Sequence, residues 1–110
     1  MASFEVVFSR VRREWRRRPE DIWVIEVNLA ARLLFNGKPE RMFVGRIGRI
    51  AEDALGDAAE LERFWSAAKA RLGRMRRLTR DDVKEIERQV AERVPRPAPG
   101  AQVMRNREVV

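Results

Sequence analysis

The sequence contains no cysteine, no histidine and no tyrosine. Without cysteine, disulfides and thiolate metal sites are excluded. The three missing side chains are also among those that enzymes use most often as nucleophiles and as general acids or bases. Few hydroxyl groups remain, and two of them, Ser3 and Thr79, stand where helix caps are expected. We therefore predict that this protein is not an enzyme, with no catalytic residue, no metal site and no cofactor.

Long apolar runs are missing as well. No stretch approaches the roughly 20 apolar residues that a membrane-spanning helix needs. The most apolar window, residues 22–35, is interrupted by Glu26, Asn28 and Arg32. The N-terminal residues do not follow the basic-then-apolar order of a signal peptide. The sequence therefore predicts no membrane span and an intracellular location, in the cytoplasm or nucleoid.

Lysine is scarce, although the chain is strongly basic. Among 24 basic residues only Lys38, Lys69 and Lys84 are lysines, and the net charge is +7 over 110 residues. A GC-rich genome or a thermophilic source would explain a preference for arginine and the dense charge. Neither explains the excess of positive charge, which points first to nucleic acid as a partner.

The spacing of apolar residues predicts five helices, because these residues recur three or four positions apart. In the first segment, for example, Phe4, Phe8 and Trp15 fall on one helical face. The predicted helices cover about 3–18, 19–35, 39–56, 57–75 and 79–94. Residues 95–110, which begin with three closely spaced prolines, are predicted to be an extended or disordered tail. The predicted fold is an all-α bundle in one domain, 1–94, whose N-terminal helix, 1–18, is rich in arginine.

Residues that start or stop helices support these boundaries. Asn36-Gly37 is typical of a left-handed helix stop, and Pro39 suits a first helical position. Asp57 and Thr79 suit N-caps. Asp81, Asp82 and Glu85 form the densest carboxylate group, which could hold a divalent ion, but a capped first helical turn predicts the same residues.

A strand is the competing interpretation of the second segment. Its residues Trp23, Ile25, Val27 and Leu29 alternate with polar positions, as they would in a half-buried strand. The Pro-Glu-Asp start and the Ala-Ala-Arg-Leu-Leu continuation favour a helix instead. The choice between helix and strand stays open at this point.

The positive charge is concentrated in two arginine clusters, at residues 10–18 and 71–80. Few carboxylates stand four positions away to neutralise them. Dense like charges of this kind favour binding of a polyanion, and the alternative is a solvated face that keeps the protein soluble. The predicted nucleic-acid-binding residues are Arg10, Arg12, Arg13, Arg16, Arg17, Arg18, Arg46, Arg49, Arg71, Arg74, Arg76 and Arg77.

The predicted mode of binding is contact with phosphates, because arginine forks on the backbone position a protein without reading sequence. Trp15, Trp23 and Trp65 all fall on apolar stripes, so we expect them in the core rather than stacked on bases. Gly45 and Gly48 indicate that either a neighbouring helix or a phosphate backbone approaches the chain closely at these positions.

The predicted layout begins with an Arg-rich N-terminal helix that ends at Pro19, followed by a small Cys-free body and a C-terminal arm. This layout resembles the major nucleocapsid proteins of filamentous DNA viruses of hyperthermophilic archaea. In that family helical subunits wrap the genome. The resemblance implies a virion protein in which Arg10, Arg12, Arg13, Arg16 and Arg17 face phosphates, while residues 95–110 contact neighbouring subunits.

The sequence thus predicts a DNA-binding or DNA-packaging structural protein without sequence specificity, acting as an oligomer on double-stranded DNA through phosphates. Self-association or a related subunit is part of that expectation. The alternative is a small basic interaction module that docks on an acidic protein surface as a regulator or inhibitor. Association with ribosomes is a third hypothesis, and DNA is not distinguished from RNA.

Overall fold

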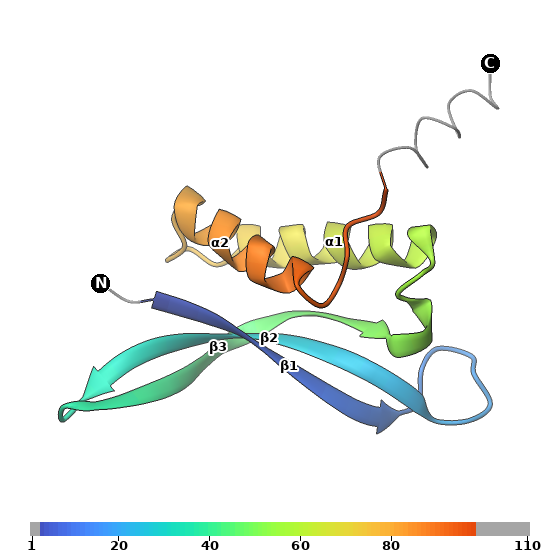
Figure 1. Cartoon of the computed structure of the whole chain (residues 1–110), viewed down its shortest axis with the longest axis horizontal. Coiled ribbons are helices and arrows are strands. Elements are labelled where there is room, and N and C mark those ends of the chain that lie inside the picture. The colour runs from blue at the N-terminus through green and yellow to red at the C-terminus, as the bar shows by residue number, and fades with distance from the viewer. Residues whose placement is uncertain (1–2, 99–110) are drawn as a thin grey trace, which may run out of the picture.

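The computed structural model describes residues 3–98, which Figure 1 shows as a twisted three-stranded sheet with two helices on one face. The strands are antiparallel in the order β1-β2-β3, so β2 is central and the other two are edges. A short 3-10 turn, η1, leads from the sheet to the helices. The elements are β1 (Ser3–Arg13), β2 (Ile22–Phe35), β3 (Lys38–Ala51), η1 (Glu52–Ala54), α1 (Ala58–Gly73) and α2 (Arg80–Ala91).

The prediction of an all-α bundle of five helices is wrong, because the first three predicted helices are strands. In β1 every second residue points toward the helices, namely Phe4, Val6 and Phe8. These three lie opposite Ala31, Leu29 and Val27 of β2. A period of two, with Glu5 and Val7 at the positions between, is the pattern of a strand that is buried on one face. The strand interpretation of the second segment is therefore the correct one.

The helical spacing in β3 comes from irregularities in its pairing with β2. The register skips Val44 and Ile47, so each is an extra residue on β3. An extra residue shifts the alternation by one position. This shift allows Ile47 and Ile50, three residues apart, both to be buried. A spacing of three, which is typical of one helical face, therefore arises here within a bulged strand.

The left-handed conformation predicted for Asn36-Gly37 is confirmed, but these residues join the strands β2 and β3 and do not end a helix. Asn36 and Gly37 both have positive φ angles, 51° and 77°. Two consecutive left-handed residues form the tight turn that joins antiparallel strands. Pro39 follows within β3, which tolerates it because β3 is an edge strand and not every N–H must be paired.

The last two predicted helices are confirmed as α1 and α2. The Asp57 side chain caps α1 by accepting hydrogen bonds from the backbone N–H groups of Ala59 and Glu60. At α2 the Thr79 hydroxyl accepts from the N–H of Asp82, at 3.1 Å, and the Asp82 carboxylate accepts from the N–H of Thr79, at 2.9 Å. These reciprocal bonds satisfy N–H groups that no helical carbonyl reaches.

Replacing Thr79 by alanine is expected to lower the free energy of unfolding by about 1 kcal/mol, because α2 then loses its cap. Urea unfolding followed by circular dichroism measures the change. Ser66→Ala is the matched control, since Ser66 is an exposed hydroxyl inside α1. We expect it to change stability by less than about 0.5 kcal/mol. Equal losses in the two variants would contradict the role of the cap.

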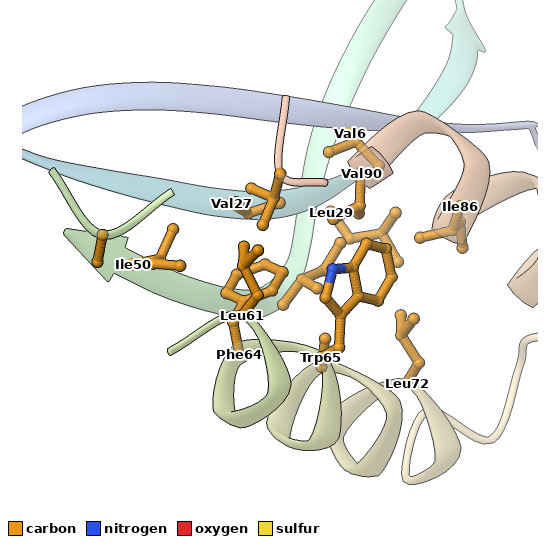
Figure 2. Close-up of a cluster of buried hydrophobic side chains, with 14 of the residues drawn as sticks. Val6, Val27, Leu29, Ile50, Leu61, Phe64, Trp65, Leu72, Ile86 and Val90 are labelled. Atoms are coloured by element: carbon orange, nitrogen blue, oxygen red, sulfur yellow. The ribbon is translucent and has the colours of Figure 1, made fainter. Parts of the chain in front are cut away.

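The core lies between the sheet and the two helices, with α1 over β3 and α2 over β1. Figure 2 shows side chains from both layers pointing toward one another. The apolar residues on the inner face of α1 are buried, among them Leu61, Trp65, Ala68 and Leu72. Their partners on the sheet include Val6, Val27, Leu29, Ile47 and Ile50.

The first residues of the predicted tail are attached to this core. The indole N–H of Trp65 donates to the carbonyl oxygen of Pro95 at 3.0 Å. The guanidinium of Arg96 lies over the Trp65 ring and pairs with Glu87 at 2.9 Å. The rest of the predicted tail, 99–110, lies outside the described residues.

Candidate nucleic-acid interface

The first arginine cluster is divided between a strand and a loop. Arg10, Arg12 and Arg13 end β1, whereas Arg16, Arg17 and Arg18 lie in the connection to β2. Successive side chains of a strand point to opposite faces. Arg10 and Arg12 therefore share a face that Arg13 does not, and the prediction that this cluster lies on an N-terminal helix is wrong.

Carboxylates from distant parts of the chain neutralise much of this cluster. Arg16 pairs with Glu60 at 2.8 Å, and Arg18 pairs with Asp53 at 2.9 Å. Both partners lie more than thirty residues away in the sequence. The expectation that the cluster lacks neutralising acids is therefore wrong for these arginines.

Arg10 is the clearest case of neutralisation within the cluster. Its guanidinium donates two hydrogen bonds to Glu52, one of them at 2.9 Å from Nη2. This contact raises the pKa of Arg10 and lowers the pKa of the Glu52 carboxyl, because it favours both charged forms. The Arg10 guanidinium also lies 3.9 Å from the centre of the Trp23 ring. Arg10 therefore already interacts with a carboxylate and with an aromatic ring of the same chain.

Arg12 and Arg17 have no ion pair within residues 3–98 and are exposed. The guanidinium of Arg12 lies 5.4 Å from the Trp23 ring centre. Trp23 is 37% exposed, so its predicted place in the core is wrong. The prediction is right for Trp65, which is buried, and Trp15 is half-buried against the core.

On the sheet, Glu26 stands among three arginines. Its carboxylate lies 3.1 Å from Arg13 and 3.9 Å from Arg46, and Arg49 is its cross-strand partner on β3. The Glu26 side chain is only 13% exposed. A single carboxylate therefore faces three guanidinium groups, which leaves an excess of two positive charges.

The pKa of Arg49 is lowered, first by burial and then by the like charges of Arg46, Arg13 and Arg71, and the charge of Glu26 offsets part of this shift. Arg71 belongs to α1, so Arg49 experiences positive charge from the sheet and from a helix at once. No carboxylate forms an ion pair with either Arg49 or Arg71 in the part of the chain that the structure describes.

Arg49 and Arg71 line a hollow of about 290 Å³ between β3 and α1, which we call the basic hollow. Its only carboxylate among the described residues is Glu60, which Arg16 and Arg63 share at 2.8 and 3.2 Å. The backbone of Arg16 is left-handed, with φ at 54°, a conformation that costs a non-glycine residue about 1 kcal/mol or more. The lining residues are Trp15, Arg16, Gly48, Arg49, Glu60, Arg63, Phe64, Ala67 and Arg71.

The basic hollow unites residues that the sequence placed in separate groups. Arg16 comes from the first cluster, Arg49 from the glycine-containing segment and Arg71 from the second cluster. Two charged members of the hollow, Glu60 and Arg63, were not predicted. No local signal marks them, because they resemble any exposed i,i+3 ion pair on a helix.

The rest of the second cluster lies at the end of α1 and in the connection to α2. Arg74, Arg76 and Arg77 have no ion pair within residues 3–98 and are exposed. Arg76 and Arg77 line a different groove, so they do not extend the basic hollow. The twelve predicted arginines therefore do not form one surface.

The space beside the two glycines of β3 is filled by side chains of the protein itself and not by a phosphate backbone. A Cβ on Gly48 would lie 2.7 Å from the Phe64 ring of α1, and a Cβ on Gly45 would lie 2.9 Å from Met75. The neighbouring-helix explanation therefore holds at Gly48, although both glycines belong to a strand.

Comparisons with protein-family models, with curated proteins and with solved structures find no match to this chain. They do not bear on the resemblance to viral nucleocapsid proteins or give support for a capsid or virion role. The helical layout that suggested this resemblance is replaced by a sheet. Within residues 3–98, neither helix is long and apolar enough to cross a membrane. The same residues contain no group of acids that could hold a metal, and Asp82 acts in the α2 cap.

Proposed function

We propose that this protein binds the phosphate backbone of nucleic acid, duplex DNA in the first instance, through the basic hollow between β3 and α1. The observation that carries the proposal is the meeting of Arg49 and Arg71 without a carboxylate of their own. Like charges held together at a partly buried site repel one another, and a bound phosphate would relieve that repulsion.

The chemistry of the hollow favours phosphates over base edges. Arginine presents a planar fork of donors that matches two phosphate oxygens. The lining contains no asparagine or glutamine, which are the usual readers of adenine. Its aromatic rings, Trp15 and Phe64, pack against the core rather than standing free as stacking platforms. The proposed binding is therefore without sequence preference.

Fluorescence anisotropy of a labelled DNA duplex across a salt series tests this proposal, after nuclease treatment of the protein. We expect the logarithm of the affinity to fall linearly with the logarithm of salt concentration, with a slope of roughly −0.9 for each phosphate contacted. Two duplexes of unrelated sequence should bind equally well. No binding at about 50 mM salt would contradict the proposal.

The same experiment separates the rival hypothesis, in which the arginines dock on an acidic protein surface. An unstructured acidic polypeptide of equal charge serves as the competitor, and single-stranded DNA and duplex RNA serve as parallel probes. Preference for the polypeptide over every nucleic acid would favour the rival. Preference for RNA would retain backbone binding and change the class of nucleic acid.

A further inference from the structure

The hairpin formed by the ends of β2 and β3 exposes most of the large apolar side chains on the molecule's surface. Of seven such exposed side chains within residues 3–98, six belong to this hairpin, and the seventh is Trp23. Leu34 and Phe43 are 79% and 67% exposed. We call these six the hairpin patch: Leu33, Leu34, Phe35, Met42, Phe43 and Val44. Exposed apolar side chains concentrated in one element in this way mark an interaction site.

An apolar groove of about 910 Å³ lies at the base of the hairpin. Its floor continues the helix-facing side of the sheet, with Phe4, Ala31 and Met42, beyond the region that the helices cover. Figure 1 shows the hairpin projecting past both helices. Met75 and Leu78, between α1 and α2, form the opposite wall. The groove is therefore a part of the core face that nothing in residues 3–98 covers.

Charged residues of both signs stand at the groove and on the hairpin. Arg76, Arg77, Asp81 and Asp82 line the groove beside its apolar floor. The hairpin carries Lys38 and Glu40 beside the patch, both exposed, whereas the neighbouring Arg41 already pairs with Glu5 at 3.6 Å. A hairpin that enters such a groove can therefore place Lys38 near the aspartates and Glu40 near the arginines.

We propose that two copies of this chain associate about a twofold axis, with the hairpin of each copy lying in the groove of the other. One surface supplies both parts of this interface, because Leu33, Met42, Phe43 and Val44 of the hairpin patch also line the groove, whereas Leu34 and Phe35 lie outside it. A twofold interface uses one surface on both subunits, so it buries both hairpins and both grooves at once.

The area available agrees with a stable dimer. Taking roughly 200 Å² as the full area of a large apolar side chain, the exposed fractions of the hairpin patch amount to about 700 Å² per copy. A standard stable interface buries about 800 Å² per partner. Edge-to-edge pairing of two β3 strands is a poorer solution, because Pro39 and the extra residue Val44 interrupt that edge.

Sedimentation velocity of the nuclease-treated full chain, across a range of protein concentrations, tests the association. We expect a dimer that the double variant Phe35→Ser with Phe43→Ser weakens by at least 100-fold in Kd. Both residues are exposed, so circular dichroism should show an unchanged fold. Trp23→Ser removes the one large exposed apolar side chain that residues 3–98 carry outside the patch, and it should leave the dimer intact.

A charge exchange tests the arrangement itself. Asp81→Arg and Lys38→Glu should each weaken the dimer by about tenfold, and the two together should restore it, because the proposed arrangement places Lys38 of each hairpin beside Asp81 of the other copy. A monomer at every concentration would overturn the proposal and leave the groove to a different partner. A dimer that survives the double serine variant, or the absence of rescue, would overturn it equally. None of these readouts involves nucleic acid, so this inference and the proposed function can fail separately.

Discussion

Replacing Arg49 and Arg71 together by glutamine is expected to weaken binding to duplex DNA by roughly 10- to 100-fold near 0.1 M salt. The two guanidinium groups line one hollow, and neither forms an ion pair with a carboxylate within residues 3–98. If each contacts a phosphate, losing both should also reduce the steepness of the salt dependence by about two. The salt series described above measures both quantities.

The matched control removes the same net charge from elsewhere on the helices. Lys69 on α1 and Lys84 on α2 are exposed, form no ion pair in the described part of the chain and do not line the basic hollow. Their double replacement by glutamine should change the affinity by only a few-fold, through net charge alone. If the two double variants behaved alike, binding would depend on overall charge and the hollow would not be the site.

Gly48→Ala is expected to lower the free energy of unfolding by about 1–3 kcal/mol, because the added methyl group overfills the core. Its Cβ would lie 2.7 Å from the ring of Phe64, and that ring is buried among the core residues. The ring therefore cannot move aside without displacing its neighbours or moving α1 away from β3. Urea unfolding of the full chain measures the loss.

Gly73→Ala is the control with the opposite expected sign. A Cβ at Gly73 would meet nothing within 4 Å, and Gly73 is the last residue of α1. Alanine there restricts the unfolded chain and favours the helix, which should stabilise the protein by up to about 1 kcal/mol. Equal stability of the Gly48 and Gly73 variants would contradict the close contact between β3 and α1.

The two helices could be predicted because their signals are local. Asp57 and Thr79 cap helices through groups two or three residues away. The apolar residues of α1 and α2 repeat with a helical period and face one core. Every interaction that starts these helices lies within a few neighbouring positions, so the sequence alone contains it.

The strands were not predicted because their stabilising contacts are not local. Phe4, Val6 and Phe8 form a strand through pairing with residues more than fifteen positions away. In β3 the extra residues Val44 and Ile47 disturb the alternation and produce a spacing that also fits a helix. Short apolar repeats of this kind are ambiguous until the partner strand is known.

The sequence by itself determined the excess of arginine, the two C-terminal helices and the left-handed conformation at Asn36-Gly37, since composition and short-range contacts decide each of them. Only the tertiary structure decided which arginines stay unpaired. Glu52, Asp53 and Glu60 neutralise part of the first cluster across long sequence separations. Packing of α1 on β3 brings Arg49 and Arg71 together, because electrostatic pairing depends on distance in space and not along the chain.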